Sequence, residues 1–447
     1  MDRKALRGRV QARFDAMIEE LFASENAPQT IDAVEEVALR LRQKAGEIVA
    51  QELSQAAAEE AEEKAKDGED TDRARTCACG RKARWKGERT IGVVTMAGEV
   101  ALTRSYFYCR LCDAGLCPAD TALGLCGTFT VRVQQEVARL GALMAYGPAM
   151  RLLSDLCGVS VCPKQAQRLS MEAGERVLLL GEERRQKAMN GEAVELAPPG
   201  RAVDVLYLEA DGVHTPIVDG WRETKVGLAR KIGTDGRPVG PTEYVSHLGN
   251  AEAFGEHWYA TAISAGLERA RKVVVLGDGA AWIWNQASYH FPEAIQILDW
   301  FHATEYLWTV ARAAFGEGNP ETTVWVKATE TLLWEGHWDD LRQALCDLAC
   351  TYPAAKDAVE TTLGYYENNR TRMDYPRYRA LGLSIGSGAA ESGCKQVVTQ
   401  RLKGAGMRWI EKGAQAIAAL RCLILADRWH SFTHSWNNAS PPQLALS

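Results

Sequence analysis

Three acidic residues beside glycine turns are the side chains of this 447-residue chain best suited to chemistry. Asp211 and Asp278 each follow an apolar run typical of a buried strand, and each precedes a glycine. Glu391 follows the turn Gly386-Ser387-Gly388. Mg²⁺ and Mn²⁺ prefer carboxylate oxygens, and two such ions about 4 Å apart can clamp the attacking and leaving oxygens of a phosphodiester. The pattern predicts a phosphoryl-transfer site, although a single acid of this kind is more commonly a strand-end or helix-capping residue.

Four cysteines in two pairs are the second candidate for chemistry. Cys77 and Cys79 flank one residue, Cys109 and Cys112 flank two, and a hairpin-like sequence of about thirty residues separates the pairs. Four thiolates on two turns suit a closed, tetrahedral and therefore structural Zn²⁺ site. The spacing of the first pair is tighter than the standard C-x-x-C. Four free buried thiols are the alternative.

Basic residues gather in two stretches of an acidic chain. The net charge of −6 arises mainly in residues 1–70, which hold 17 acids and 10 bases. Residues 71–110 and residues 370–412 each hold nine bases and three acids. Such patches indicate contact with nucleic acid, with ordinary surface charge as the alternative. The cations expected to meet DNA phosphates are Lys164, Arg168, Lys395, Arg401, Lys403 and Arg408.

The chain lacks the features of a membrane or secreted protein. No apolar run reaches the roughly 18 residues that cross a bilayer, and the N-terminus is charged rather than signal-like. We therefore expect a cytoplasmic protein whose 12 cysteines stay reduced.

Three regions are expected before the first acid. Residues 1–70 form an acidic helical arm, broken at Ala27-Pro28, that serves association or DNA-end contact unless it is only a surface arm. Residues 76–126 form the zinc-knuckle β-hairpin domain. Residues 130–185 read as helix, short glycine turn and helix, which is the helix-turn-helix pattern, although an αα-hairpin without DNA contact fits equally well. A linker with proline and glycine follows over residues 189–200.

The acids fall in a mixed pattern of strands and helices. A three-strand meander is followed by helix, strand, helix, strand and helix, which predicts a ribonuclease H-like α/β core over residues 201–300 and 384–430. Acids at the carboxyl ends of its strands would gather at one edge. Residues 301–383 read as a helical insertion, so the whole chain is multidomain, α+β and α/β. The expected strands cover residues 203–208, 224–232, 242–248, 273–276 and 295–298, and the helix after the meander covers residues 251–270.

Four short motifs connect these acids with a known family. They are Asp211-Gly212, Gly277-Asp278-Gly279, Asp299-x-x-His302 and Gly386-Ser387-Gly388-x-x-Glu391-Ser392. Together they resemble the DDE transposases of bacterial insertion sequences, and Asp-x-x-His is similar to a signature of the Mutator-like superfamily. The Gly-Met-Arg-Trp tail ending at Trp409 most resembles the Kra-type insertion-sequence family. The resemblance covers about residues 76–430, so it leaves the acidic arm unexplained, and the C-x-C pair departs from the family pattern.

The resemblance implies Mg²⁺-dependent cleavage at the element ends and strand transfer into target DNA. Asp211, Asp278 and Glu391 would hold the metal, and His302 would orient a phosphate or a water unless it is a structural residue. The implied partners are double-stranded DNA, as terminal inverted repeats and target, and further copies of the chain in a synaptic complex at the bacterial nucleoid. The alternatives are a transposase-derived DNA-binding protein without catalysis and a metal-dependent nuclease. Three tryptophans of the insertion are more typical of core than of base stacking: Trp325, Trp334 and Trp338.

Overall fold

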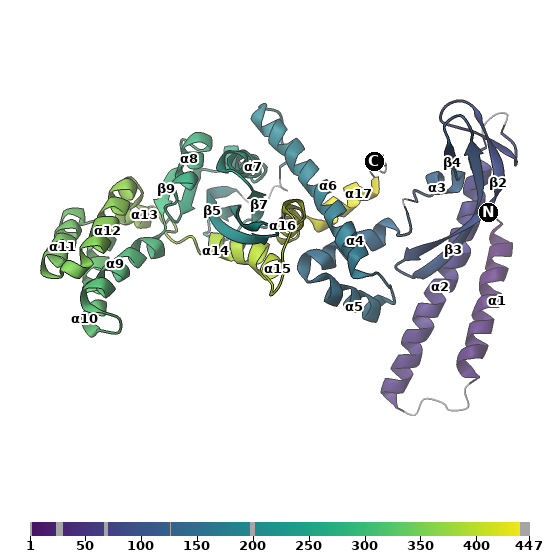
Figure 1. The fold of residues 1–447 in the computed structure, drawn as a ribbon, viewed down its shortest axis with the longest axis horizontal. Helices are drawn as coiled ribbons and strands as arrows, with labels where there is room; N and C mark the ends of the chain where they lie inside the picture. Colours follow the sequence, from purple (N-terminus) through teal and green to yellow (C-terminus); the bar gives the residue numbers. More distant parts are fainter. Residues whose placement is uncertain (1, 24–29, 67–69, 126, 197–201, 439–447) are drawn as a thin grey trace. The chain divides into compact units, whose positions relative to one another are not determined.

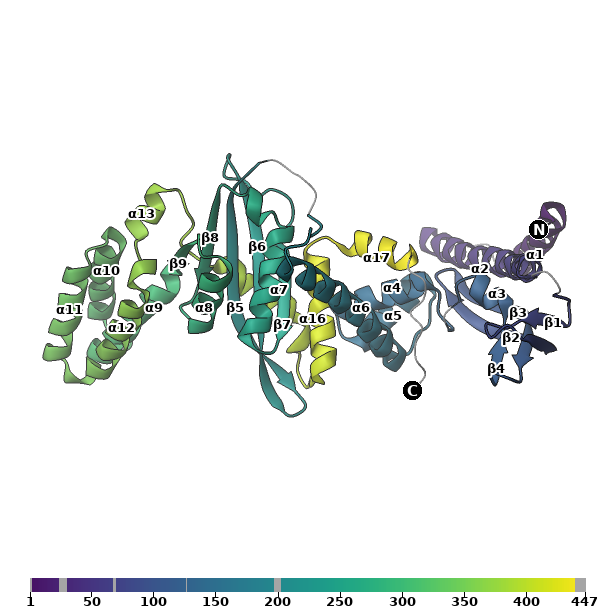
Figure 2. The ribbon, with the colours of Figure 1, turned by 90° about the horizontal axis from the view of Figure 1, so that it is seen from above.

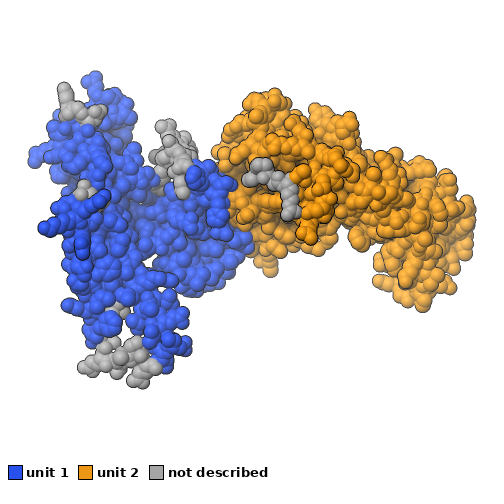
Figure 3. Space-filling view, turned by 180° about the vertical axis from the view of Figure 1, so that it is seen from behind, with its two compact units in different colours: residues 1–173, 430–447 blue, residues 174–429 orange. Residues whose placement is uncertain are grey.

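The chain is described here by a computed structural model, which forms two compact units (Figure 3). The first unit holds residues 1–173 and 430–447, and the second holds residues 174–429. The predicted break at Ala27-Pro28, most of the acidic linker at 67–70 and the end of the linker at 189–200 lie outside the described residues. None of the described helices is both long and apolar enough to cross a membrane. The structure describes residues 2–23, 30–66, 70–125, 127–196 and 202–438.

Two paired helices begin the first unit, in the region expected to be helical. Helix α1 spans Arg3–Phe22 and helix α2 spans Ile31–Lys64. Asp2 caps α1, since its carboxylate accepts hydrogen bonds from the first backbone N–H groups of the helix. Glu52 of α2 joins the two helices through ion pairs to Arg9 and Arg13 of α1 at 2.9 and 3.0 Å.

A four-stranded antiparallel sheet follows in chain order (Figure 1). On the edge of β3 that faces away from β2, only the short β4 pairs with the strand. Most of the backbone groups on that edge are therefore accessible to α2. Gln51 and Gln55 of α2 fill this edge, because each side-chain amide bonds both the N–H and the C=O of one β3 residue, Ala101 and Thr103, at 2.7–3.0 Å. The arm and the sheet are therefore packed together. The strands are β1 Ala74–Thr76, β2 Lys82–Thr95, β3 Gly98–Cys109 and β4 Ala114–Leu116.

Helices complete the first unit and include the predicted helix, turn and helix. Gly158 ends α5 with a left-handed φ of 66°, a conformation that glycine adopts without strain. Val133, Val137 and Leu153 lie in the shared core of these helices. The helical order is confirmed, and its contact with DNA stays a prediction. The helices are α3 Pro118–Ala122, α4 Val131–Leu143, α5 Tyr146–Cys157, α6 Pro163–Met189 and α17 Trp429–Asn438, of which α6 and α17 run across the unit boundaries.

A five-stranded sheet in the order β7-β6-β5-β8-β9 forms the centre of the second unit (Figure 2). β5, β6 and β7 pair antiparallel, while β8 and β9 run parallel to β5. All five predicted strands are confirmed, but the first was expected to end at Leu208 and continues to Ile217. Its antiparallel pairing with β6 goes on after its parallel partner β8 has ended. The strands are β5 Val203–Ile217, β6 Gly220–Gly233, β7 Glu243–Leu248, β8 Lys272–Gly277 and β9 Ile295–Leu298.

Helices cover this sheet and close its open edge. Phe254 and Trp258 of α7 (Ala251–Ser264) are fully buried in the core. α7 is shorter than expected because Gly266, at φ 95°, and a 3₁₀ turn over Leu267–Arg269 follow it. On the edge strand β7, Gln415 of α16 (Glu411–Leu425) accepts from the N–H of Leu248 at 2.6 Å and donates to the C=O of Ser246 at 3.0 Å.

Helices follow β9 and fill the sequence up to the return of the chain to the sheet. Trp325 and Trp338 are half-buried against the core, and Trp334 packs between Trp300 and Arg379, so these side chains serve packing. After α13 the chain returns to the sheet through residues 381–387. The remaining elements are α8 Ala281–His290, α9 Trp300–Phe315, α10 Pro320–Glu335, α11 Trp338–Thr351, α12 Lys356–Asn369, α13 Tyr375–Ala380, α14 Gly388–Cys394, a π-helical turn Lys395–Thr399 and α15 Gln400–Leu402.

Candidate functional site

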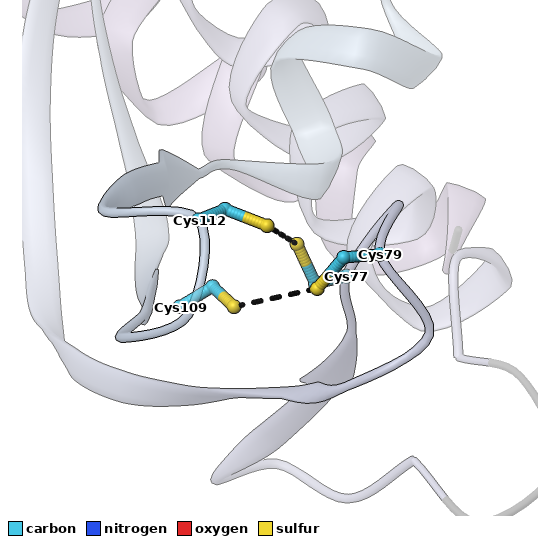
Figure 4. Close-up of side chains that lie close together, drawn as sticks. All are labelled: Cys77, Cys79, Cys109 and Cys112. Carbon is cyan, nitrogen blue, oxygen red and sulfur yellow. Dashed lines mark hydrogen bonds between the residues drawn. The ribbon is translucent and has the colours of Figure 1, made fainter.

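Four cysteine thiols meet at one end of the first unit's sheet (Figure 4). The Sγ atoms of Cys77 and Cys112 lie 3.8 Å apart, those of Cys79 and Cys109 lie 3.7 Å apart, and all four lie within 4.8 Å of one another. A tetrahedron with Zn–S bonds of about 2.3 Å has edges of about 3.8 Å. The cluster could therefore hold a metal such as zinc.

Two tight turns bring these thiols together. Cys77 and Cys79 lie on the turn between β1 and β2, where Gly80 has a left-handed φ of 78° and donates its N–H to the C=O of Cys77 at 2.8 Å. Cys109 ends β3, and Cys112 lies in the turn before β4. Backbone N–H groups of this second turn, first that of Cys112, lower the pKa of the Cys109 thiol to about 7. Both turns thus present thiols to one point, and the second favours the thiolate form of Cys109, the form that binds metal.

Asp211 lies within β5, and Asp278 directly follows β8, the parallel neighbour of β5. In the pairing of β5 with β8, Glu209 lies opposite Leu276. The same register, extended by two residues, sets Asp211 beside Asp278. Burial raises the pKa of Asp211, and the nearby charge of Asp278 raises it further. Two of the three predicted acids are therefore neighbours, although Asp211 lies within β5 rather than at its end.

Backbone contacts fix the carboxylate of Asp278 and the turn that carries it. Its Oδ1 accepts the N–H of Ala280 at 2.9 Å. Tyr365 of α12, in the helical insertion, donates its hydroxyl to the C=O of Asp278 at 2.6 Å. Gly279 adopts a φ of 98°, and a Cβ at this position would collide with the ring of Tyr365. The insertion therefore holds the Asp278 turn in place.

Glu391 is exposed and pairs with Lys395 on the same stretch of helix. Its Oε1 lies 2.6 Å from the Nζ of Lys395, and that contact is the main cause of the lowered pKa of Glu391. Over the described parts of the chain, only the four cysteines gather three or more potential ligands within 4.8 Å. In this conformation Glu391 thus does not complete a compact triad with Asp211 and Asp278.

Two buried acids outside the predicted set anchor α14, the helix that carries Glu391. Glu209 of β5 accepts the N–H of Ala390 at 3.1 Å. Asp299, just after β9, accepts the hydroxyl of Ser387 at 2.8 Å and also its N–H. The sequence signals were a lone acid inside an apolar run for Glu209 and the Asp-x-x-His motif for Asp299.

His302 lies on the first turn of α9, close to the acids. Its imidazole is 45% exposed, and its Nδ1 is 3.3 Å from a carboxylate oxygen of Glu305. A positive charge on this imidazole opposes the rise in the pKa of Asp211, which burial causes, and adds slightly to the fall in the pKa of Glu391, which Lys395 causes. Cys394 of α14 adds a buried thiol that hydrogen-bonds Asp211. The charges of Asp278 and His302 and the thiol of Cys394 thus all act on Asp211.

The cations predicted to bind DNA differ in accessibility. Lys164, Lys403 and Arg408 are exposed. Arg168 is exposed but forms an ion pair with Glu172 at 2.9 Å. An exposed i,i+4 pair contributes only about 0.3–0.5 kcal/mol, so Arg168 can readily exchange its partner for a phosphate.

The prediction that Arg401 contacts DNA phosphates is wrong for this structure. It is only 2% exposed, and its guanidinium lies 4.9 Å from the ring centroid of the buried Trp409. The short helix α15 turns this side chain inward, so Arg401 cannot reach a phosphate in this conformation. A basic stretch read from the sequence does not reveal which of its cations faces the core.

Comparison with known proteins shows the family of the chain. The model of a family described as uncharacterised, UPF0236, matches residues 33–427, which is most of the chain. No curated protein matches the chain.

Proposed function

We propose that this chain, which belongs to the uncharacterised protein family UPF0236, is a DDE-type transposase that cleaves DNA at element ends and joins it to target DNA. The observation that carries the proposal is the position of Asp211, within β5, beside Asp278, which directly follows the parallel strand β8. The helix of Glu391 is fastened to the same strand through Glu209. A metal-dependent strand transferase needs its acids gathered in this way from distant parts of the chain.

The order of strands supports a ribonuclease H-like core. Three antiparallel strands are continued on one side by two parallel ones, in the order β7-β6-β5-β8-β9. A helical insertion divides this core before the third acid, as the resemblance to DDE transposases implies. The acids then lie where the parallel pair β5 and β8 ends, the edge at which ligands bind in such sheets.

The side chains of the acidic site suit divalent metal and phosphate. Asp211 and Asp278 offer hard oxygen ligands, and Glu391 would join them by leaving Lys395, an exchange that an exposed ion pair permits at low cost. Mg²⁺ held there would supply charge stabilisation and an activated hydroxyl for attack on the phosphodiester. Lys395, once released, would meet a phosphate, and His302, whose charge acts on Asp211 and Glu391, would orient the water or the 3′-OH.

The other modules would bind DNA and shape the protein. Zn²⁺ in the cysteine cluster would tie β1 to β3 and act structurally. Lys164 and Arg168 on the first turns of α6 and Lys403 and Arg408 near α16 would contact phosphates of the element end and the target. We expect a dimer or higher oligomer that pairs two element ends.

A cleavage assay tests the proposal. The full chain with Mg²⁺ is expected to cut a duplex that carries the inverted repeats flanking its own coding region, and to join the freed end to plasmid DNA. Asp278→Asn should abolish both steps and leave binding of that duplex intact. Asp340→Asn, which alters an exposed acid of α11, is the matched control. Full activity of Asp278→Asn would refute the role of the acids.

A DNA-binding protein without catalysis is the second candidate. The contact between Glu391 and Lys395 favours it, because Glu391 pairs with a cation there and does not form a compact group with the other two acids. In that case the wild-type chain would bind the flanking duplex but cut nothing with Mg²⁺ or Mn²⁺. Cutting without joining would instead indicate a nuclease.

A further inference from the structure

Large apolar side chains lie exposed at the tip of the β5–β6 hairpin. Val218 and Trp221 are 53% and 58% exposed, and Ile410, just before α16, is 54% exposed. We call these three residues and the cation Lys403 the hairpin-tip surface. The hairpin extends well past the other strands of its sheet (Figure 2). Exposed apolar groups gathered in this way mark an interaction site.

Backbone hydrogen bonds hold this surface in position. The N–H of Val218 donates to the C=O of Trp409 at 2.9 Å, and the N–H of Trp409 donates to the C=O of Pro216 at 3.2 Å. The indole of Trp409 is buried and donates to the C=O of Leu402 at 3.0 Å. The hairpin tip is therefore clasped to the segment before α16, so Trp221 is presented by fixed backbone.

Basic side chains lie beside the exposed indole. The Nζ of Lys403 lies 5.8 Å from the centroid of the Trp221 ring, within the range of a cation–π contact. Arg222 follows Trp221 and lies 3.4 Å from Glu411, with both side chains more than half exposed. Arg408 is exposed on the same clasped segment. Aromatic rings flanked by lysine and arginine are the surface that unstacked bases and their phosphates fit.

We propose that the hairpin-tip surface binds DNA whose bases are unpaired, with one base stacked on the indole of Trp221. Lys403 and Arg408 would bind the phosphates on either side of that base. Val218 and Ile410 would shield the opened step as apolar wedges do in kinked DNA. This inference deepens the proposed function, because it names a distorted DNA end as the preferred partner.

The register of the hairpin gives the place of that base relative to the acids. Trp221 pairs with Pro216, which is five residues beyond Asp211 along β5. At about 3.4 Å per residue the separation is roughly 17 Å, or about five base steps along a strand. Because side chains alternate between the faces of a sheet and five residues is an odd spacing, Trp221 is on the face opposite Asp211, so the unpaired base should lie at least about five positions from the scissile phosphate.

A binding experiment with the full chain tests this surface. The probes are a short, fully paired duplex and the same duplex with a central run of mismatches that contains 2-aminopurine. Wild-type protein is expected to bind the mismatched duplex more tightly and to quench its fluorescence. Trp221→Ala should weaken binding of the mismatched duplex about tenfold and relieve the quenching, while Trp221→Phe retains most of both.

Two control variants distinguish the effect of base stacking on Trp221 from the effects of charge and of losing any exposed aromatic side chain. Tyr289→Ala removes another exposed aromatic side chain of the same unit and should change neither affinity. Lys403→Ala should weaken both duplexes by the same factor and reduce the salt dependence of binding by about one ion.

The contrary outcomes are equally definite. Equal losses for the two duplexes in Trp221→Ala, or none, would overturn the proposal. A lower oligomeric mass of Trp221→Ala in light scattering, with the preference for mismatches unchanged, would make the surface a contact between copies. Because this readout needs no cleavage, it can succeed while the Asp278→Asn test fails, and the reverse also holds.

Discussion

Oε2 of Glu209 accepts the backbone N–H of Ala390 at 3.1 Å and so joins two positions 181 residues apart. Glu209 is wholly buried, and its Oε1 pairs with Arg230 at 3.1 Å. Burial raises the pKa of this carboxyl, and Arg230 opposes the shift. A buried charge is costly unless it is paired. Here it is retained at the point where the Glu391 helix meets the central strand.

Removal of this carboxylate should loosen the Glu391 helix. We expect Glu209→Ala to lower the free energy of unfolding by about 3 kcal/mol, because the N–H of Ala390 and the charge of Arg230 both lose their partner. Urea denaturation measures the change. Glu360→Gln, which breaks an exposed i,i+4 pair with Lys356, is the control and should stay within about 0.5 kcal/mol. Similar losses for the two variants would contradict the anchoring role.

Two glycines near Tyr365 should respond in opposite directions to alanine. Gly279→Ala meets both a φ of 98° and the Tyr365 ring, so we expect a loss of about 1–3 kcal/mol in stability. Gly364→Ala lies in α12 with open space around it and should gain about 0.5–1 kcal/mol through helix propensity. Thermal denaturation of both variants measures the difference. A neutral Gly279→Ala would show that the Asp278 turn has room to move.

The cysteine cluster should bind one zinc ion per chain. Replacing Cys109 and Cys112 by serine is expected to abolish zinc, as measured by elemental analysis, and to lower the melting temperature. Cys350→Ser changes an exposed cysteine outside the cluster and should keep the metal. A wild-type protein that is purified without chelator and still lacks zinc would leave the cluster as four thiols.

A partly buried histidine should make the fold sensitive to acid. Burial, with a smaller effect of His247, lowers the pKa of His257 to about 4 from its ordinary 6.5. Between pH 6.5 and 4, His257 is therefore protonated in the unfolded chain and neutral in the folded chain. Stability from this group is present above pH 6.5 and declines as the pH falls toward 4, by at most about 1.4 kcal/mol per pH unit.

Comparison of the wild-type chain with His257→Gln tests this decline. Urea denaturation between pH 7 and 4 should give a steeper loss of stability for the wild type. His247 and His290, whose pKa values burial also lowers, should account for part of the decline that remains in the variant. If stability falls equally steeply with pH in both proteins, His257 does not cause the acid sensitivity.

Local patterns predicted the secondary structure around the site well. The strands at 273–276 and 295–298 were short apolar runs between turn residues, and the structure extends the first by one residue at each end and keeps the second unchanged. The four-residue spacing of Glu391 and Lys395 also permits the ion pair that forms between them. The end of β5 was missed because its apolar run stops while its pairing with β6 continues through polar residues.

Long-range contacts were beyond what spacing can reveal. The inward turn of Arg401 depends on Trp409, and the anchoring role of Asp299 depends on Ser387, 88 positions later. Single side chains of these types are common on surfaces, so their burial follows only from the assembled fold. The exposure of Trp221 could not be predicted for the same reason, because it results from the length of the β5–β6 hairpin.

Glutamine side chains line the open edges of both sheets. Gln51 and Gln55 bond the free side of β3, and Gln415 bonds the free side of β7, each through paired donor and acceptor contacts that imitate a neighbouring strand. An open strand edge invites pairing with another chain. During synthesis β3 is made after Gln51 and Gln55, whereas β7 is made before Gln415, which lies 167 positions after Leu248. Nascent or truncated chains that end before Gln415 would therefore expose an aggregation-prone edge at β7. We expect chaperones to bind such chains at this edge.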